Sequence, residues 1–179
     1  MKRRVNRATD ANDPRMEALL KFRLIVNSTR RHFRWIETQC GVNGVQLWAL
    51  WEIGNANELT VTGLAHALAI HQSSASNLVE KLVSARLVLR RKLAVDKRVV
   101  TLELAARGIK LLARAPEPAR GLLPEALQRL PPAAVATLNN GLGALLDAMG
   151  VTDAEDVAMP LGLALSGRIA QQRSRLGRG

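Results

Sequence analysis

The sequence predicts a mainly α-helical (α+β) fold in which one short β-hairpin interrupts a series of helices. Apolar residues recur at helical spacing along most of the chain between residues 14 and 150. Two short runs rich in β-branched residues, 87–92 and 99–104, stand close together and have the composition of strands. A length of 179 residues suits one domain with an adequate core.

The first helix is predicted over residues 14–39, after a basic segment, residues 1–13, that we expect to be a flexible arm. Asp13 precedes Pro14, and this pair predicts a helix start because aspartate caps the first turn and proline is tolerated there. Cys40 is expected just past the end of this helix. Apolar residues suggest that one side of the helix is buried along its length, at Leu19, Phe22, Val26, Phe33 and Ile36.

Three more helices are predicted before the hairpin. One runs from about residue 44 to residue 55, and Leu59 with Thr60 then forms a staple and cap for a helix that begins at Val61. After a tight break comes another helix, whose apolar residues share one face: Ala75, Leu78, Val79, Leu82 and Val83. Two helices joined in this way are typical of a helix-turn-helix, whose second helix enters the major groove of DNA.

Candidate DNA-binding residues lie on the polar face of this last helix and on the hairpin. The helix contributes Ser73, Ser74, Ser76, Asn77 and Lys81, and the hairpin contributes Arg90, Lys92, Asp96, Lys97 and Arg98. A run of cations alone is equally well explained as a solvated hairpin face. Because this run of cations directly follows a recognition-type helix, the interpretation that it contacts phosphates and the minor groove is favoured. The order of elements therefore predicts a winged helix-turn-helix.

Residues 64–108 resemble the MarR family of bacterial transcription regulators. The helix-turn-helix matches the family pattern at Leu64, Ala65, Leu68, Ser73, Leu78, Val79, Leu82, Leu87 and Val88, and the wing matches it at Arg90, Asp96, Arg98, Val100, Leu104 and Gly108. The resemblance implies that Asp96 orients Arg98 for contact with the DNA backbone or minor groove. A looser likeness over residues 16–149 implies a homodimer in which the first helix and the last two interleave.

Several positions depart from the family pattern. Arg86 stands where a glycine usually ends the recognition helix, so a left-handed conformation is less favourable there. His71 and Ala105 replace residues whose side chains commonly cap a helix, and Asn77 stands where a basic residue is frequent. We expect these differences to change individual base contacts and to leave the fold intact.

Beyond the hairpin, we expect helices over residues 105–113, 122–130 and 131–149, because Pro116 and Pro118 must break the first of them. Residues 152–155 form a capping box that predicts a short helix to Met159. The rest of the extension is expected to be partly disordered, which we favour over a DNA-contacting or dimer-embracing tail. The predicted organisation is an arm (1–13), N-terminal helices for dimerisation and effector binding (14–56), a winged part (57–104), C-terminal dimerisation helices (105–150) and an extension (151–179).

Trp35, Trp48 and Trp51 fall near the place where the family keeps its effector pocket. Aromatic residues at helical spacing are more often plain core, which we favour, and a pocket for an aromatic or phenolic effector is the alternative. Cys40 is expected to be inert or partly buried rather than redox-sensing, because the chain contains no tyrosine to support a reactive thiol. The histidines lack accompanying ligands, so no metal site is predicted.

A net charge of +11 favours a polyanionic partner. No apolar run approaches the roughly 18 residues of a membrane span, and we expect a cytoplasmic protein. No phosphate loop, nucleophile elbow or paired catalytic carboxylates occur, so neither an enzyme nor a bound cofactor is expected. We expect a homodimeric, ligand-responsive repressor that binds a pseudo-palindromic operator in double-stranded DNA. The alternatives are a nucleoid-type non-specific DNA-binding protein and a winged-helix adaptor that binds protein.

Overall fold

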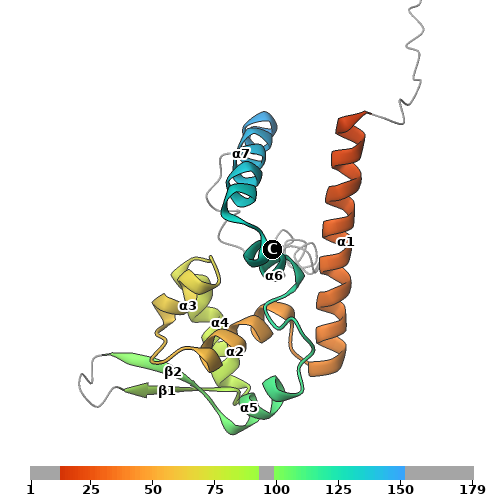
Figure 1. The fold of residues 1–179 in the computed structure, drawn as a ribbon. Helices are drawn as coiled ribbons and strands as arrows, with labels where there is room; N and C mark the ends of the chain where they lie inside the picture. The colour runs from red at the N-terminus through yellow and green to blue at the C-terminus, as the bar shows by residue number, and fades with distance from the viewer. Residues whose placement is uncertain (1–12, 93–98, 152–179) are drawn as a thin grey trace, which may run out of the picture.

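The computed structural model describes residues 13–92 and 99–151 and confirms a mainly helical fold with one antiparallel hairpin (Figure 1). Along the chain the elements are α1 (Pro14–Cys40), α2 (Gly44–Asn55), α3 (Val61–Ala67), α4 (Gln72–Ser84), β1 (Val88–Lys92), β2 (Val100–Leu104), α5 (Ala106–Ala113), α6 (Leu122–Arg129) and α7 (Pro132–Met149). The basic arm, the hairpin tip and the C-terminal extension lie outside the described residues. Within the described part, no helix is long and apolar enough to cross a membrane.

The ends of α1 follow from local chemistry. The Asp13 carboxylate accepts a hydrogen bond from the Arg15 backbone N–H at 2.9 Å, and Pro14 occupies the first turn, as expected. At the other end, Gly41 adopts a left-handed conformation (φ 69°) and its N–H donates to the Glu37 carbonyl. Because the helix is closed by Gly41, Cys40 is its last residue, and the expectation that this cysteine lies past the helix end is wrong.

Helix caps differ in strength along the winged part, a name used from here on for α2 to α5 with the hairpin, residues 44–113. Asn43 and Gln46 form a reciprocal capping box at the start of α2, with two hydrogen bonds of 2.9 Å. The Thr60 hydroxyl accepts from the Gly63 N–H at 3.1 Å, which confirms the predicted cap of α3. The N-cap residues of α4 and α5, His71 and Ala105, make no capping side-chain hydrogen bond, as their departure from the family pattern implies.

The core of the winged part surrounds α2, which contacts α1, α3, α5 and β2. Leu47 and Leu50 of α2 are fully buried, as are Val79 and Leu82 on the inner face of α4. The hairpin pairs Val88 with Leu104 and Lys92 with Val100. The Leu102 N–H also donates to the Leu59 carbonyl at 2.8 Å, so the segment before α3 extends the hairpin on its second edge.

Gly108 allows α5 to approach the end of α4 closely. A Cβ atom placed on Gly108 would lie 2.1 Å from the Leu87 carbonyl oxygen, which is far inside contact distance. The same oxygen accepts a hydrogen bond from the Ala105 N–H at 2.9 Å. Any side chain at residue 108 would therefore displace backbone, which explains physically the glycine of the wing pattern.

The first half of α1 and all of α7 present apolar side chains to solvent. Leu19 is 50% exposed and Phe22 is 39% exposed, so the cover expected on one side of this helix does not come from the same chain in this half. The buried residues of α1 begin only at Thr29, where α2 and α6 lie against it. Helix α7 has no buried residue, and Figure 1 shows α6 and α7 rising beside α1, away from the winged part.

Two non-glycine residues end helices of the winged part in the left-handed conformation. Ala69 (φ 51°) follows α3 and Arg86 (φ 56°) follows α4. Each turn has the paired hydrogen bonds of a Schellman motif; in the second, Arg86 and Leu87 donate to the carbonyls of Val83 and Leu82. The left-handed conformation that the sequence makes unfavourable at Arg86 is therefore present without glycine, at a cost of about 1–2 kcal/mol for an L-residue.

Ala69→Gly should consequently stabilise the protein. Glycine removes the strain energy of the left-handed conformation, but it also raises the conformational entropy of the unfolded chain. Because the first effect is larger, we expect the free energy of unfolding to rise by about 0.5–1 kcal/mol. Urea denaturation measures this gain. Ala126→Gly, at an exposed position inside α6, is the matched control and should cost about 0.5–1 kcal/mol. Equal losses from both variants would show that Ala69 is not strained.

Candidate nucleic-acid interface

Helix α4 presents a polar stripe to solvent while its apolar face is buried. Ser73, Asn77 and Lys81 are all exposed, and their spacing of four residues places them on one side of the helix. Ala75 and Val79 are fully buried on the opposite side, where α3 lies against α4. The stripe is thus held in a fixed orientation by the core behind it.

Ser74 and Ser76 differ from the other candidates on this helix. Both are partly buried, and the Ser76 hydroxyl donates to the Gln72 carbonyl of its own helix at 2.9 Å. Sequence alone gave the five polar candidates of α4 equal weight, because helical spacing does not show which hydroxyl already has a partner. The structure separates three outward side chains from these two.

The hairpin places its described cations on two faces. Alternation along β1 puts Arg90 and Lys92 on one face, and both are exposed. Arg91 lies on the other face, where its Nε donates to the Glu103 carboxylate at 3.0 Å. More than half of each of these two side chains is exposed, so this ion pair contributes about 0–1 kcal/mol at most. Asp96, Lys97 and Arg98 lie outside the described residues.

The three tryptophans have different surroundings. Trp35 is 47% exposed, so it is not part of the core of this chain, although the centre of its ring lies 5.7 Å from the ring centre of buried His32. Trp48 and Trp51 are partly buried against the core. Trp48 donates its indole N–H to Glu52 Oε1 at 2.8 Å, and the guanidinium of Arg120 lies 4.0 Å from the centre of the Trp51 ring.

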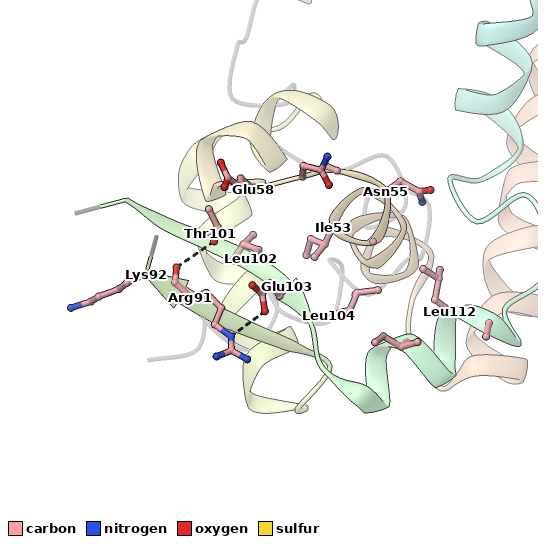
Figure 2. A pocket seen from close by; sticks show the side chains of 15 residues that line it. Ile53, Asn55, Glu58, Arg91, Lys92, Thr101, Leu102, Glu103, Leu104 and Leu112 are labelled. Carbon is pink, nitrogen blue, oxygen red and sulfur yellow. Dashed lines mark hydrogen bonds and ion pairs between the residues drawn. The ribbon is translucent and has the colours of Figure 1, made fainter. Parts of the chain in front are cut away.

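A hollow of about 1160 Å³ lies between the end of α2, the hairpin and α5. Figure 2 shows the residues that line it. Its apolar lining includes Ile53, Leu104 and Leu112, and the Arg91–Glu103 pair lies across the hairpin side. None of the three tryptophans lines this hollow. The effector site expected at the tryptophans therefore stays a prediction.

Two groups with reactive or ligating chemistry are enclosed by packing. Burial raises the pKa of the Cys40 thiol, and the positive charge of Arg114 opposes that rise only in part. His32 is buried, and its Nε2 donates to the Pro118 carbonyl at 3.1 Å. Over residues 13–92 and 99–151, no group of three or more histidine, cysteine or acidic side chains is placed to hold a metal ion.

Comparison with known proteins gives the same assignment as the geometry. Residues 41–99, from the end of α1 to the start of β2, match the family model described as MarR family. This segment is similar in sequence to the MarR family. The resemblance drawn from the helix-turn-helix and wing motifs is confirmed over these residues, and the fold matches that of winged MarR-type structures. No curated protein matches the chain.

Solved structures of MarR-type proteins share the fold. A complex of S. aureus MepR with DNA is 20% identical and has a TM-score of 0.53, and the match covers 76% of this chain and 99% of that one. A MarR/EmrR family transcriptional regulator from Acinetobacter sp. ADP1 is 17% identical, with a TM-score of 0.52 and coverage of 77% and 98%. A MepR-like protein in complex with pseudoligands is 20% identical, with a TM-score of 0.51 and coverage of 75% and 94%. At these identities the likeness shows the fold alone.

The raised pKa of Cys40 makes a prediction about thiol chemistry. A raised pKa leaves less thiolate at a given pH, and burial blocks access, so alkylation of the native protein at pH 7–8 should be much slower than alkylation of the chain unfolded in urea. Mass spectrometry of iodoacetamide-treated samples measures both rates. Equal rates in the native and unfolded protein would contradict the inert assignment and favour a sensing thiol.

Proposed function

We propose that this protein is a sequence-specific DNA-binding transcription regulator that acts as a homodimeric repressor and is released by a small molecule. The observation that carries the proposal is the exposed stripe of Ser73, Asn77 and Lys81 on a rigidly packed helix of a MarR-type winged fold. Since its proposed partner is operator DNA, its proposed place is the cytoplasm.

The proposed contacts divide into base reading and phosphate binding. Asn77 can pair with adenine through both atoms of its amide, and Ser73 can reach either base type. Lys81, Arg90 and Lys92 are proposed to bind phosphates, with Ser74 and Ser76 in supporting contacts at the edge of the stripe. On the sequence alone, Lys97 and Arg98 extend this contact at the hairpin tip and Asp96 orients Arg98.

A second copy of this chain is the proposed cover for the apolar surfaces of α1 and α7. On α7, Leu138, Leu145 and Met149 recur at helical spacing and are 38%, 40% and 62% exposed. An exposed apolar surface of this kind marks an interface. A two-fold dimer would present two copies of α4 to half-sites about 10 base pairs apart.

The proposed release by an effector rests on Trp35, Trp48 and Trp51. Trp48 and Trp51 lie on α2, and a proposed aromatic or phenolic ligand would contact them between the winged part and the helices that dimerise. The ligand must prefer the conformation that does not bind DNA, because equal affinity for both conformations shifts nothing. A MepR-like protein of this fold has been crystallised in complex with pseudoligands, which supports testing small molecules as effectors.

Selection from a random-sequence duplex library tests the function directly. A regulator should enrich one pseudo-palindromic sequence and bind it at least about 10³-fold more tightly than random DNA at physiological salt. Enrichment of no sequence, with affinity set by salt alone, would indicate the nucleoid-type alternative. If the protein bound no DNA at all, the remaining alternative would be a winged-helix adaptor that binds protein.

Replacing Asn77 and Lys81 separates their proposed roles. Asn77→Ala should cost about 1–3 kcal/mol at the selected sequence and relax preference at one base pair, because a bidentate contact is lost. Lys81→Ala should weaken binding to all duplexes alike and reduce the salt dependence by about one ion. Fluorescence anisotropy on selected and random duplexes measures both effects. Identical behaviour of the two variants would contradict the assignment.

Leu145→Glu should dissociate the dimer, because it places a charge in the proposed apolar interface. Asn140→Glu introduces the same charge on the opposite side of α7 and is the matched control. Sedimentation equilibrium should find the parent and the control dimeric at micromolar concentration and Leu145→Glu largely monomeric. A dimeric Leu145→Glu protein would show that α7 does not form the interface.

A further inference from the structure

Residues 114–121 are the covalent link between the winged part and helices α6 and α7. Pro116 and Pro118 prevent a continuous helix through this link, because each lacks a backbone donor and clashes with the preceding turn. The direction in which α6 leaves the winged part therefore depends on how the link is held by other residues.

The link is fixed to α2 by Arg120. Its guanidinium lies 4.0 Å from the centre of the Trp51 ring, and its Nε lies 3.1 Å from Glu52 Oε1. The same Glu52 oxygen accepts the Trp48 indole N–H at 2.8 Å. The Arg120 and Glu52 side chains are only 19% and 13% exposed, so solvent screens their attraction much less than that of a surface pair.

Arg120 Nε is shielded from solvent and has no directed hydrogen bond in this arrangement. Its charge is compensated by the Glu52 carboxylate and by the face of the Trp51 ring. Removal of either charge would leave the other poorly compensated in a partly buried site. Breaking the contact at one partner alone would therefore be costly.

A second attachment fixes the link to α1. The Pro118 carbonyl accepts the His32 Nε2 hydrogen at 3.1 Å, and Ala119 between the two attachment points is 2% exposed. By contrast, α7 buries no residue against its own chain. Residues 118–120, together with the contact between α6 and α1, thus set the orientation of α6 and α7 relative to the winged part.

We propose that Arg120 is a positioning residue that fixes the spacing between the two recognition helices of the dimer, and hence the operator spacing that the protein accepts. The inference rests on the proposed function, since it requires a dimer that binds two half-sites. One added base pair shifts the second half-site by about 3.4 Å and turns it by about 35°. A rigid link cannot follow that change, whereas a loosened link can.

Arg120→Gln tests the inference, with Arg129→Gln as the matched control. Arg129 forms an exposed pair with Glu125 within α6, so the control loses the same charge without touching the link. The probes are duplexes that carry the selected half-sites with the spacer of the enriched sequence, or with one base pair added or removed. The parent and the control should lose about tenfold or more in affinity on each changed spacer, and Arg120→Gln less than about threefold.

Glu52→Gln provides a second variant that keeps an acceptor for Trp48 and removes the partner charge of Arg120. It should show the same flattened spacing profile and carries the test if Arg120→Gln does not fold. Unchanged spacing preference in a folded Arg120 or Glu52 variant, with affinity lowered equally on all three spacers, would overturn the positioning role. Failure of the parent to bind any selected duplex would instead overturn the proposed function.

Discussion

The packing of α2 is the constraint on which the rest of the structure depends. Its inner residues Leu47, Leu50 and Ile53 are buried where α1, α3, α5 and β2 meet. On its outer side, Trp51 and Glu52 hold the arginine of the link that leads to α6 and α7. Helix α4 packs on α3, which packs on α2, so the orientations of α4 and of the C-terminal helices both depend on α2. A ligand that moved α2 would alter both together.

Arginine side chains occupy two distinct environments in this basic chain. Exposed cations such as Arg90 remain hydrated, which suits the proposed non-specific attraction of phosphates. The Arg120 side chain is largely buried and contacts the Glu52 carboxylate and the Trp51 ring. Net charge alone cannot distinguish these roles, because it counts a structural cation and a binding cation equally.

Local features were predictable from sequence, whereas features that depend on the approach of distant segments were not. Asp13 and Thr60 revealed their caps because capping acts over three residues. Exposure of Leu19 and Phe22 could not be predicted, since apolar spacing does not show whether the cover comes from the same chain. The Glu52–Arg120 ion pair could not be predicted from the sequence, because no repeating sequence pattern relates residues of α2 to residues of the link. For the candidate interface, the sequence predicted α4 and the wing but could not predict the internal hydrogen bond of Ser76.

Hydroxyl-radical footprinting on the selected duplex tests the central claim most directly, since it reports where the protein touches the backbone without altering any residue. Two copies of α4 on a two-fold dimer predict protected regions centred about 10 base pairs apart and related by a dyad, with further protection where the wings reach the flanking minor grooves. Uniform protection along the duplex, without symmetry or helical phasing, would contradict the account and show that the winged part binds DNA without reading it.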